Sequence, residues 1–112
     1  MPTVLVIGAS RGIGLELARQ YAADGARVIA THRRAEDAAV LRALGARPLA
    51  LDVLATAAPE ALGRQLEGEV LDLAFLSAGV YGPRSAAPQA PTVAEFDAVM
   101  RTNVLAPMQL IA

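Results

Sequence analysis

The chain has 112 residues, of which 54% are apolar and 19% are charged, and its formal net charge is −1. These values are typical of one small globular domain with a single core. The sequence contains no cysteine and one histidine, His32, so we expect neither a disulfide framework nor a metal site. The near-neutral charge argues against nucleic-acid binding. The lack of cysteine fits a cytoplasmic location.

Uncharged stretches are too short to suggest a membrane helix. The longest, 73–83 and 102–112, have 11 residues each, whereas a spanning helix needs roughly 20. We therefore expect no membrane partner. All ten basic residues are arginine, and the absence of lysine limits the chemistry considered below.

Short apolar runs alternate with segments of helical periodicity, which predicts an α/β fold. The predicted strands are 3–7, 27–31, 48–51 and 71–77. Three helices are predicted between these strands. The first begins at Ile13 and stops at Asp24–Gly25, and the other two cover about 36–44 and 59–67. Strands that are apolar throughout and joined by helices predict a doubly wound parallel sheet covered on both faces.

Residues 78–91 are rich in glycine and proline and are interpreted as an exposed loop. Thr92 and Glu95 then have capping-box spacing, and a helix is predicted from there to the end of the chain. Pro107 stands four residues after Asn103 and has no N–H, so a kink is expected and the Asn103 carbonyl loses its helical donor. The alternative is a structural kink with Asn103 on a polar face.

A glycine-rich segment lies where the first strand becomes the first helix. Glycines at this place permit a tight turn and let a diphosphate approach the backbone, while the helix N-terminus stabilises negative charge. The alternative is a ligand-free turn. The P-loop pattern is excluded because no lysine follows. The candidate cofactor-binding residues of this segment are Gly8, Ser10, Arg11, Gly12, Ile13 and Gly14.

The pattern Gly8-x-x-x-Gly12-x-Gly14 resembles the cofactor loop of the short-chain dehydrogenases/reductases. These are Rossmann-fold enzymes that move hydride between a nicotinamide cofactor and an alcohol or carbonyl. Three later features match in order: Leu51-Asp52-Val53, Ser77-Ala78-Gly79 and Asn103. Ile7 and Ser77 depart from the threonine and asparagine common in the family, which implies a somewhat altered site.

The resemblance implies a role for each matched residue. Asp52 would bond the adenine amine, Val53 would lie beside the ring, and Ala78 and Gly79 would line the ribose. The alternative for Asp52 is an acid at a helix N-terminus. A strand order of 3-2-1-4 would bring the loops of Gly12 and Ala78 face to face. Asn103 would belong to the catalytic proton relay.

The end of the second strand indicates which cofactor is preferred. An NAD site has a carboxylate about 20 residues beyond the glycines, but no acid occurs here before Glu36. Arg33, together with Arg11, could instead pair with a 2′-phosphate. We therefore expect NADP rather than NAD. The alternative is that these arginines are solvated surface charges. His32 is interpreted as an edge residue rather than a catalyst.

The catalytic Tyr-x-x-x-Lys of the family is absent, since neither Tyr21 nor Tyr81 is followed by a lysine. The chain alone should therefore be inactive. We expect residues 1–112 to be one NAD(P)-binding domain, the N-terminal part of a longer single-domain reductase with a small-molecule substrate. The apolar fourth strand and last helix indicate that a further segment or a second subunit packs there, and we expect a homo-oligomer at full length.

Two other classes of protein are considered. One is a catalytically inactive nucleotide-binding or regulatory module. The other is a methyltransferase-type α/β domain, which is disfavoured because the acid expected at the end of the second strand is missing.

Overall fold

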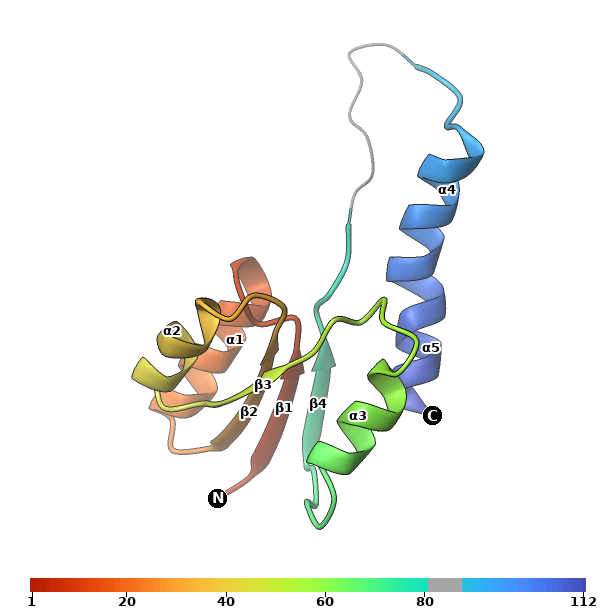
Figure 1. Cartoon of the computed structure of the whole chain (residues 1–112). Helices are drawn as coiled ribbons and strands as arrows, with labels where there is room; N and C mark the ends of the chain where they lie inside the picture. Colours follow the sequence, from red (N-terminus) through yellow and green to blue (C-terminus); the bar gives the residue numbers. More distant parts are fainter. Residues whose placement is uncertain (81–87) are drawn as a thin grey trace.

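The computed structural model describes residues 1–80 and 88–112, so Tyr81 lies outside the described part. A four-stranded sheet is covered by helices on both faces, with α1 and α2 on one face and α3 and α5 on the other (Figure 1). The strands are β1 Thr3–Ile7, β2 Arg27–His32, β3 Arg47–Ala50 and β4 Leu73–Leu76. The helices are α1 Gly12–Ala23, α2 Asp37–Ala43, α3 Ala58–Gln65, α4 Val93–Met100, the π-helical turn η1 Arg101–Leu105 and α5 Ala106–Ile111.

The strand order is β3-β2-β1-β4 and all pairs are parallel, which confirms the predicted doubly wound arrangement and its order. Val6 of β1 pairs with Ala30 on one side and with Phe75 on the other. The carboxyl ends of β1, β2 and β4 therefore meet at one edge of the sheet. In doubly wound sheets this edge carries the ligand.

Alternate residues of the strands supply two separate cores because successive side chains point to opposite faces. Val4 and Val6 pack toward α1 and α2, where they meet Ala18 and Leu41. The neighbouring positions of the same strand face α3 and α5. That second core contains Leu5, Ile7, Ile29, Leu49, Ala58 and Leu62, with Leu110 packed against it. Burial on both faces explains why the strands are apolar throughout.

Two predicted elements differ from the structure. The fourth strand is Leu73–Leu76 and so is shorter than the expected 71–77; Asp72 precedes it, and the Asp72 carboxylate accepts a hydrogen bond from the Thr3 amide at 2.7 Å. The last helix is continuous in path but contains η1 at the place where Pro107 predicted a disturbance. The Ala106 amide there bonds the Arg101 carbonyl, five residues earlier.

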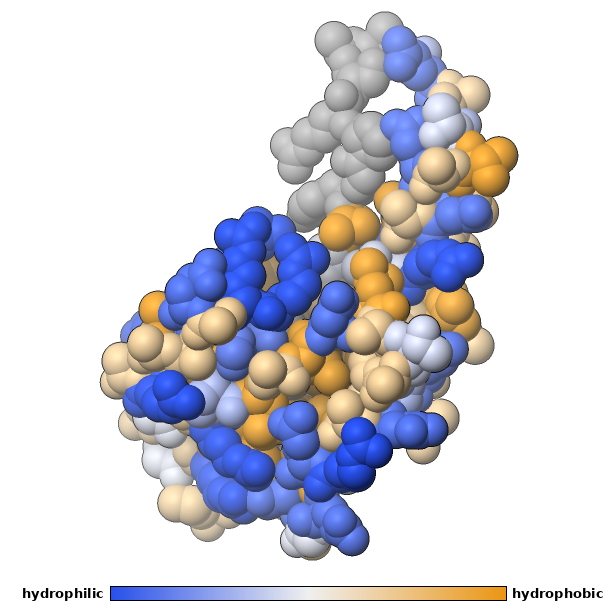
Figure 2. All heavy atoms as spheres, viewed as in Figure 1, coloured by the Kyte–Doolittle hydropathy of each residue, from blue (hydrophilic) through white to orange (hydrophobic). Residues whose placement is uncertain are grey.

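Apolar side chains are exposed along α4 to α5, and they gather on this part of the surface in Figure 2. Phe96 is 54% exposed and Met108 is 65% exposed. The free edge strand β4 also exposes Leu73 and Leu76. Within residues 1–80 and 88–112, no helix has both the length and the apolar character to cross a bilayer.

Candidate functional site

The turn after β1 is tightly constrained at two glycines and open at a third. A Cβ on Gly8 would lie 2.7 Å from the Ala78 nitrogen, and a Cβ on Gly14 would lie 2.0 Å from the Gly8 carbonyl oxygen. Gly12 has a φ of +59°, and nothing lies within 4 Å of where its Cβ would be. The turn therefore packs against the loop after β4, while Gly12 leaves its own backbone accessible.

The first turn of α1 is not neutralised by the protein's own side chains. Arg11 precedes the helix in an extended conformation and makes no side-chain cap, and the first turn contains no acidic residue. The first N–H groups of a helix lack intrahelical partners and carry a partial positive charge. Gly12 and Ile13 are exposed, Ser10 is half-buried and Gly14 is buried. This end of α1 can therefore bind an anion such as a phosphate.

Thr31 of β2 holds the turn of residues 8–14, called the glycine turn below, in place. The sequence did not predict this contact. Its hydroxyl accepts a hydrogen bond from the Gly8 amide at 2.9 Å, and its carbonyl accepts one from the Ala9 amide at 2.9 Å. The Thr31 side chain is 1% exposed. The one available signal was a polar residue inside an otherwise apolar buried strand.

The arginines near this edge are available to a ligand. Arg11, Arg33 and Arg34 are exposed and form no ion pair within residues 1–80 and 88–112. Three other arginines are used structurally: Arg19 pairs with Glu16, and Arg27 and Arg47 pair with Glu69. His32 is only 6% exposed and ends β2, an inner strand, so its interpretation as an edge residue was wrong.

Asp52 and Val53 follow β3 in a turn that borders a cavity of about 360 Å³. Oδ1 of Asp52 accepts a hydrogen bond from the Leu54 amide at 3.0 Å. Asp52 is exposed, and Oδ2 has no partner among the described residues. Because α3 begins only at Ala58, Asp52 stabilises the turn and is not the N-terminal acid of the helix.

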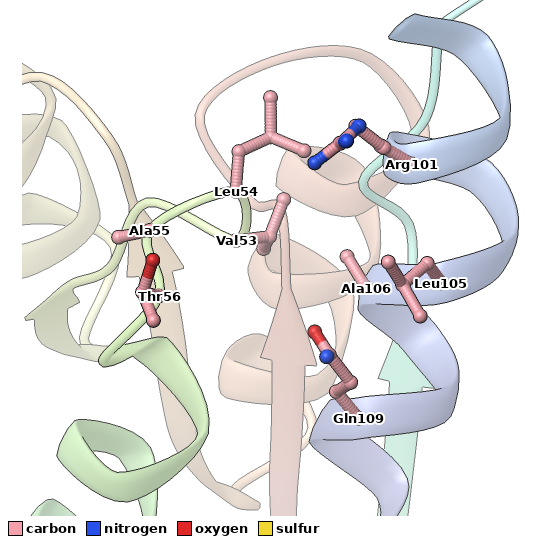
Figure 3. A pocket seen from close by; sticks show the side chains of 8 residues that line it. All are labelled: Val53, Leu54, Ala55, Thr56, Arg101, Leu105, Ala106 and Gln109. Atoms are coloured by element: carbon pink, nitrogen blue, oxygen red, sulfur yellow. The ribbon is translucent and has the colours of Figure 1, made fainter. Parts of the chain in front are cut away.

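Figure 3 shows that this cavity lies between the turn after β3 and the helix running from η1 to α5. The Arg101 guanidinium points across its mouth toward Leu54, and the Gln109 side chain points into it. Val53 is the one predicted site residue that lines it; no residue of the glycine turn does. The cavity is thus beside the Asp52–Val53 end of the site and separate from the first turn of α1.

Asn103 holds the loop after β4 against the last helix. Its Oδ1 accepts a hydrogen bond from the Val80 amide at 2.8 Å, and its Nδ2 donates to the Val80 carbonyl at 2.7 Å. Asn103 lies within η1. A Cβ on Gly79 would be 3.2 Å from the Asn103 Oδ1. The side chain therefore positions the backbone that follows Ala78 and Gly79.

Tyr21 contributes to the core. Its ring lies 5.6 Å from the ring of Phe75, and both side chains are half-buried between α1 and the sheet. No group of three metal-ligating side chains occurs within the described ranges 1–80 and 88–112.

The carboxyl edge of the sheet thus brings together the glycine turn and residues 77–78, and the turns after β2 and β3 end at the same edge (Figure 1). An uncapped helix N-terminus faces this edge. Together they define a Rossmann-type α/β protein.

Comparison with known proteins places the chain more narrowly. The sequence profile described as "short chain dehydrogenase" matches residues 2–112. The chain belongs to the short-chain dehydrogenase family.

Individual relatives agree with this assignment. The ketoacyl reductase HetN of Nostoc sp. (strain PCC 7120) is 33% identical, with 96% of this chain and 40% of HetN aligned. A short-chain dehydrogenase/reductase of Burkholderia multivorans with bound NADP superposes with a TM-score of 0.87 at 32% identity, covering 98% of this chain and 51% of that one. A carbonyl reductase of Pseudomonas aeruginosa PAO1 in complex with NADP superposes with a TM-score of 0.87 at 31% identity, covering 98% of this chain and 53% of that one. The chain thus spans about half the length of these proteins or less.

Proposed function

We propose that this chain is the NADP-binding part of a short-chain dehydrogenase/reductase that transfers hydride between NADP(H) and an alcohol or carbonyl substrate. The first turn of α1 is the observation that supports this function most. It has no side-chain cap and no acid, and it starts at the ligand-bearing edge of the sheet. A pyrophosphate bound there would accept hydrogen bonds from the free amides.

The glycine turn fits a dinucleotide. Gly12 leaves open space above its backbone, so phosphate oxygens can come within hydrogen-bonding distance. When bound, a nicotinamide cofactor supplies the hydride. The residues of this chain would bind and orient it: Ser10 to Gly14 at the pyrophosphate, and Ala78 and Gly79 at the ribose. Asn103 would position the loop after them and contribute its backbone carbonyl to the proton relay.

The adenosine end favours NADP over NAD. Asp52 has a free carboxylate oxygen for the adenine amine, and Val53 would lie beside the ring. No carboxylate ends β2, whereas Arg11 and Arg33 are exposed and unpaired among the described residues. Two similar structures, from B. multivorans and P. aeruginosa, contain NADP.

The remaining features of the proposal concern the whole protein. We propose that the 112 residues are a single NAD(P)-binding domain and form the N-terminal part of a longer single-domain reductase. It would act in the cytoplasm on a small molecule. The exposed apolar side chains of α4 to α5 support a homo-oligomer.

A second candidate is a module that binds the nucleotide without catalysis. The observation favouring it is that Tyr21 packs against Phe75 in the core and does not line the carboxyl edge of the sheet. Both candidates predict that residues 1–112 alone are inactive, so oxidation of NADPH with a panel of carbonyl compounds is measured on the longer protein that the first candidate requires, and this measurement separates the two. Turnover would contradict the module, whereas nucleotide binding without turnover would support it.

Calorimetric titration of the full chain with NADP⁺ and NAD⁺ tests the proposal. We expect tighter binding of NADP⁺, and about tenfold weaker NADP⁺ binding in Arg33→Ala, because a charge-assisted pair is lost. Arg42→Ala, an exposed arginine at the end of α2, is the matched control and should bind like the wild type. Equal affinity for both dinucleotides, or none for either, contradicts the proposal.

A further inference from the structure

His32 occupies a position that is decisive in dinucleotide-binding folds. It is the last residue of β2, about 20 residues beyond the glycine turn, where NAD-binding proteins have a carboxylate for the ribose hydroxyl. We propose that His32 is a positioning residue that fixes the turn bearing Arg33 and Arg34, and thereby sets the preference for a 2′-phosphorylated dinucleotide. This inference rests on the proposed function.

The imidazole is tied to the turn that follows it. Nδ1 of His32 lies 2.8 Å from the carbonyl oxygen of Arg34. A carbonyl oxygen only accepts hydrogen bonds, so Nδ1 carries a proton and donates it to this bond. The bond joins the strand end to a backbone group two residues later, and so closes the turn.

The strand end itself is firmly anchored. The His32 carbonyl accepts a hydrogen bond from the Leu51 amide at 2.9 Å, and His32 is paired with Ala50 in the β2–β3 ladder. With 6% of the residue exposed, the ring has little room to turn. The Arg34 carbonyl is therefore held by a rigid group.

A fixed turn helps only a ligand that the arginines recognise. Both guanidinium groups after His32 are exposed and have no ion-pair partner among the described residues. Holding their backbone lowers the entropy lost when they pair with a phosphate dianion. A dinucleotide with a free 2′-hydroxyl offers no such charge, so its binding should not depend on this turn.

Thr31, the residue before His32, affects the pyrophosphate site and not the proposed 2′-phosphate site. Thr31 binds the Gly8 and Ala9 amides and so holds the glycine turn, which meets the pyrophosphate shared by NADP and NAD. Loss of the Thr31 hydroxyl in Thr31→Val should weaken both dinucleotides equally. This variant is the matched control for His32.

The test is a calorimetric titration of the full chain with NADP⁺ and NAD⁺. His32→Ala should weaken NADP⁺ binding about three- to tenfold, as expected for one lost hydrogen bond, and should change NAD⁺ binding less than twofold. His32→Asn should restore most of the NADP⁺ affinity, because its Nδ2 is a donor at the same number of bonds from the backbone as Nδ1. Equal weakening of both dinucleotides, no weakening, or no rescue by asparagine overturns the inference.

A measurement on the wild type covers the case in which His32→Ala does not fold. The chain has one histidine, so the ring ¹⁵N resonances need no assignment. We expect Nδ1 to be protonated in the free protein. A neutral ring protonated at Nε2 would overturn the inference.

If the wild type binds neither dinucleotide, both the proposed function and this inference fail. A wild-type preference for NADP⁺ that His32→Ala leaves unchanged removes this inference alone.

Discussion

Two glycines of the turn after β1, Gly12 and Gly14, resist replacement by a larger residue for different reasons. Gly14 is limited by space, since a Cβ would overlap the Gly8 carbonyl. Gly12 is limited by its backbone conformation, which disfavours any residue with a Cβ. The sequence pattern predicted that glycine is needed here, but the pattern alone does not separate a packing glycine from one that leaves room for a ligand.

Alanine substitution separates these two demands. We expect Gly14→Ala to lower the free energy of unfolding by about 3 kcal/mol through overpacking. Gly12→Ala should cost about 1–2 kcal/mol and weaken NADP⁺ binding. Gly63→Ala, in α3 with open space around it, is the control and should stabilise the chain by about 0.5–1 kcal/mol. Urea denaturation measures all three, and a Gly14→Ala chain as stable as the wild type contradicts the packing analysis.

Asn103 was predicted from its motif, but its side-chain partner was not. The contact with Val80 joins residues 23 apart in the chain, and no local pattern shows which backbone group the amide meets. The same limit applies to the bonds from Thr31 to the glycine turn. Motifs predicted the candidate residues of the site, whereas the contacts that hold these residues depend on the assembled sheet.

Removal of the Asn103 amide should loosen the loop after β4. Asn103→Ala loses both bonds to Val80, so the Val80 amide should exchange with solvent about fivefold faster, equivalent to about 1 kcal/mol. Asn103→Asp keeps the acceptor for this amide but has no donor for the Val80 carbonyl, so its exchange rate should lie between those of the wild type and Asn103→Ala. Hydrogen exchange followed by NMR measures the effect. An unchanged exchange rate in Asn103→Ala would show that the side chain does not hold the loop.

Among the elements, the strands were the most predictable and the helix ends the least. Burial on both faces makes β1 and β2 continuous apolar runs, which are visible in the sequence. The start of α4 was also predictable, because Thr92 and Glu95 form the capping box that their spacing indicated. The π-helical form of η1 was not, since Pro107 predicts a disturbance without fixing its geometry.

The capping box makes α4 sensitive to acid. The Thr92 backbone amide, and secondly its side chain, hold the pKa of Glu95 below its usual value of 4.5. The contribution of the carboxylate to folding is therefore complete above about pH 4.5 and is lost as the pH falls through the lower folded value. An NMR titration of the Glu95 carboxyl measures this pKa. Thr92→Ala should raise it and destabilise the helix by about 1 kcal/mol; a titration at the usual value in the wild type contradicts the cap.

Pro107 provides a test of the η1 geometry. Alanine at this position restores an N–H that can donate to the Asn103 carbonyl, four residues earlier. We expect Pro107→Ala to make 101–105 more regularly α-helical, to stabilise the helix by about 1 kcal/mol, and to displace any water bound at that carbonyl. Crystal structures of both proteins measure the change. An unaltered π-helical turn in the variant would mean that Pro107 does not cause it.

For the whole molecule, the fold class and strand order were predictable because chain connectivity and strand polarity leave few arrangements. The chain spans about half the length of its solved relatives, and its exposed apolar residues lie on β4 and along α4 to α5. The activity and substrate class proposed above are those of a longer protein. Cofactor binding is different, since every residue proposed for it lies at one edge of the described sheet.

The central claim is that a dinucleotide's pyrophosphate rests on the first turn of α1. A ¹H–¹⁵N NMR titration of the chain with NADP⁺ tests it most directly. We predict that the largest amide shifts occur at residues 10–14 and 77–80, with smaller changes at the amino ends of the strands. If the amide chemical shifts of residues 10–14 do not change at a saturating concentration of NADP⁺, the claim is contradicted.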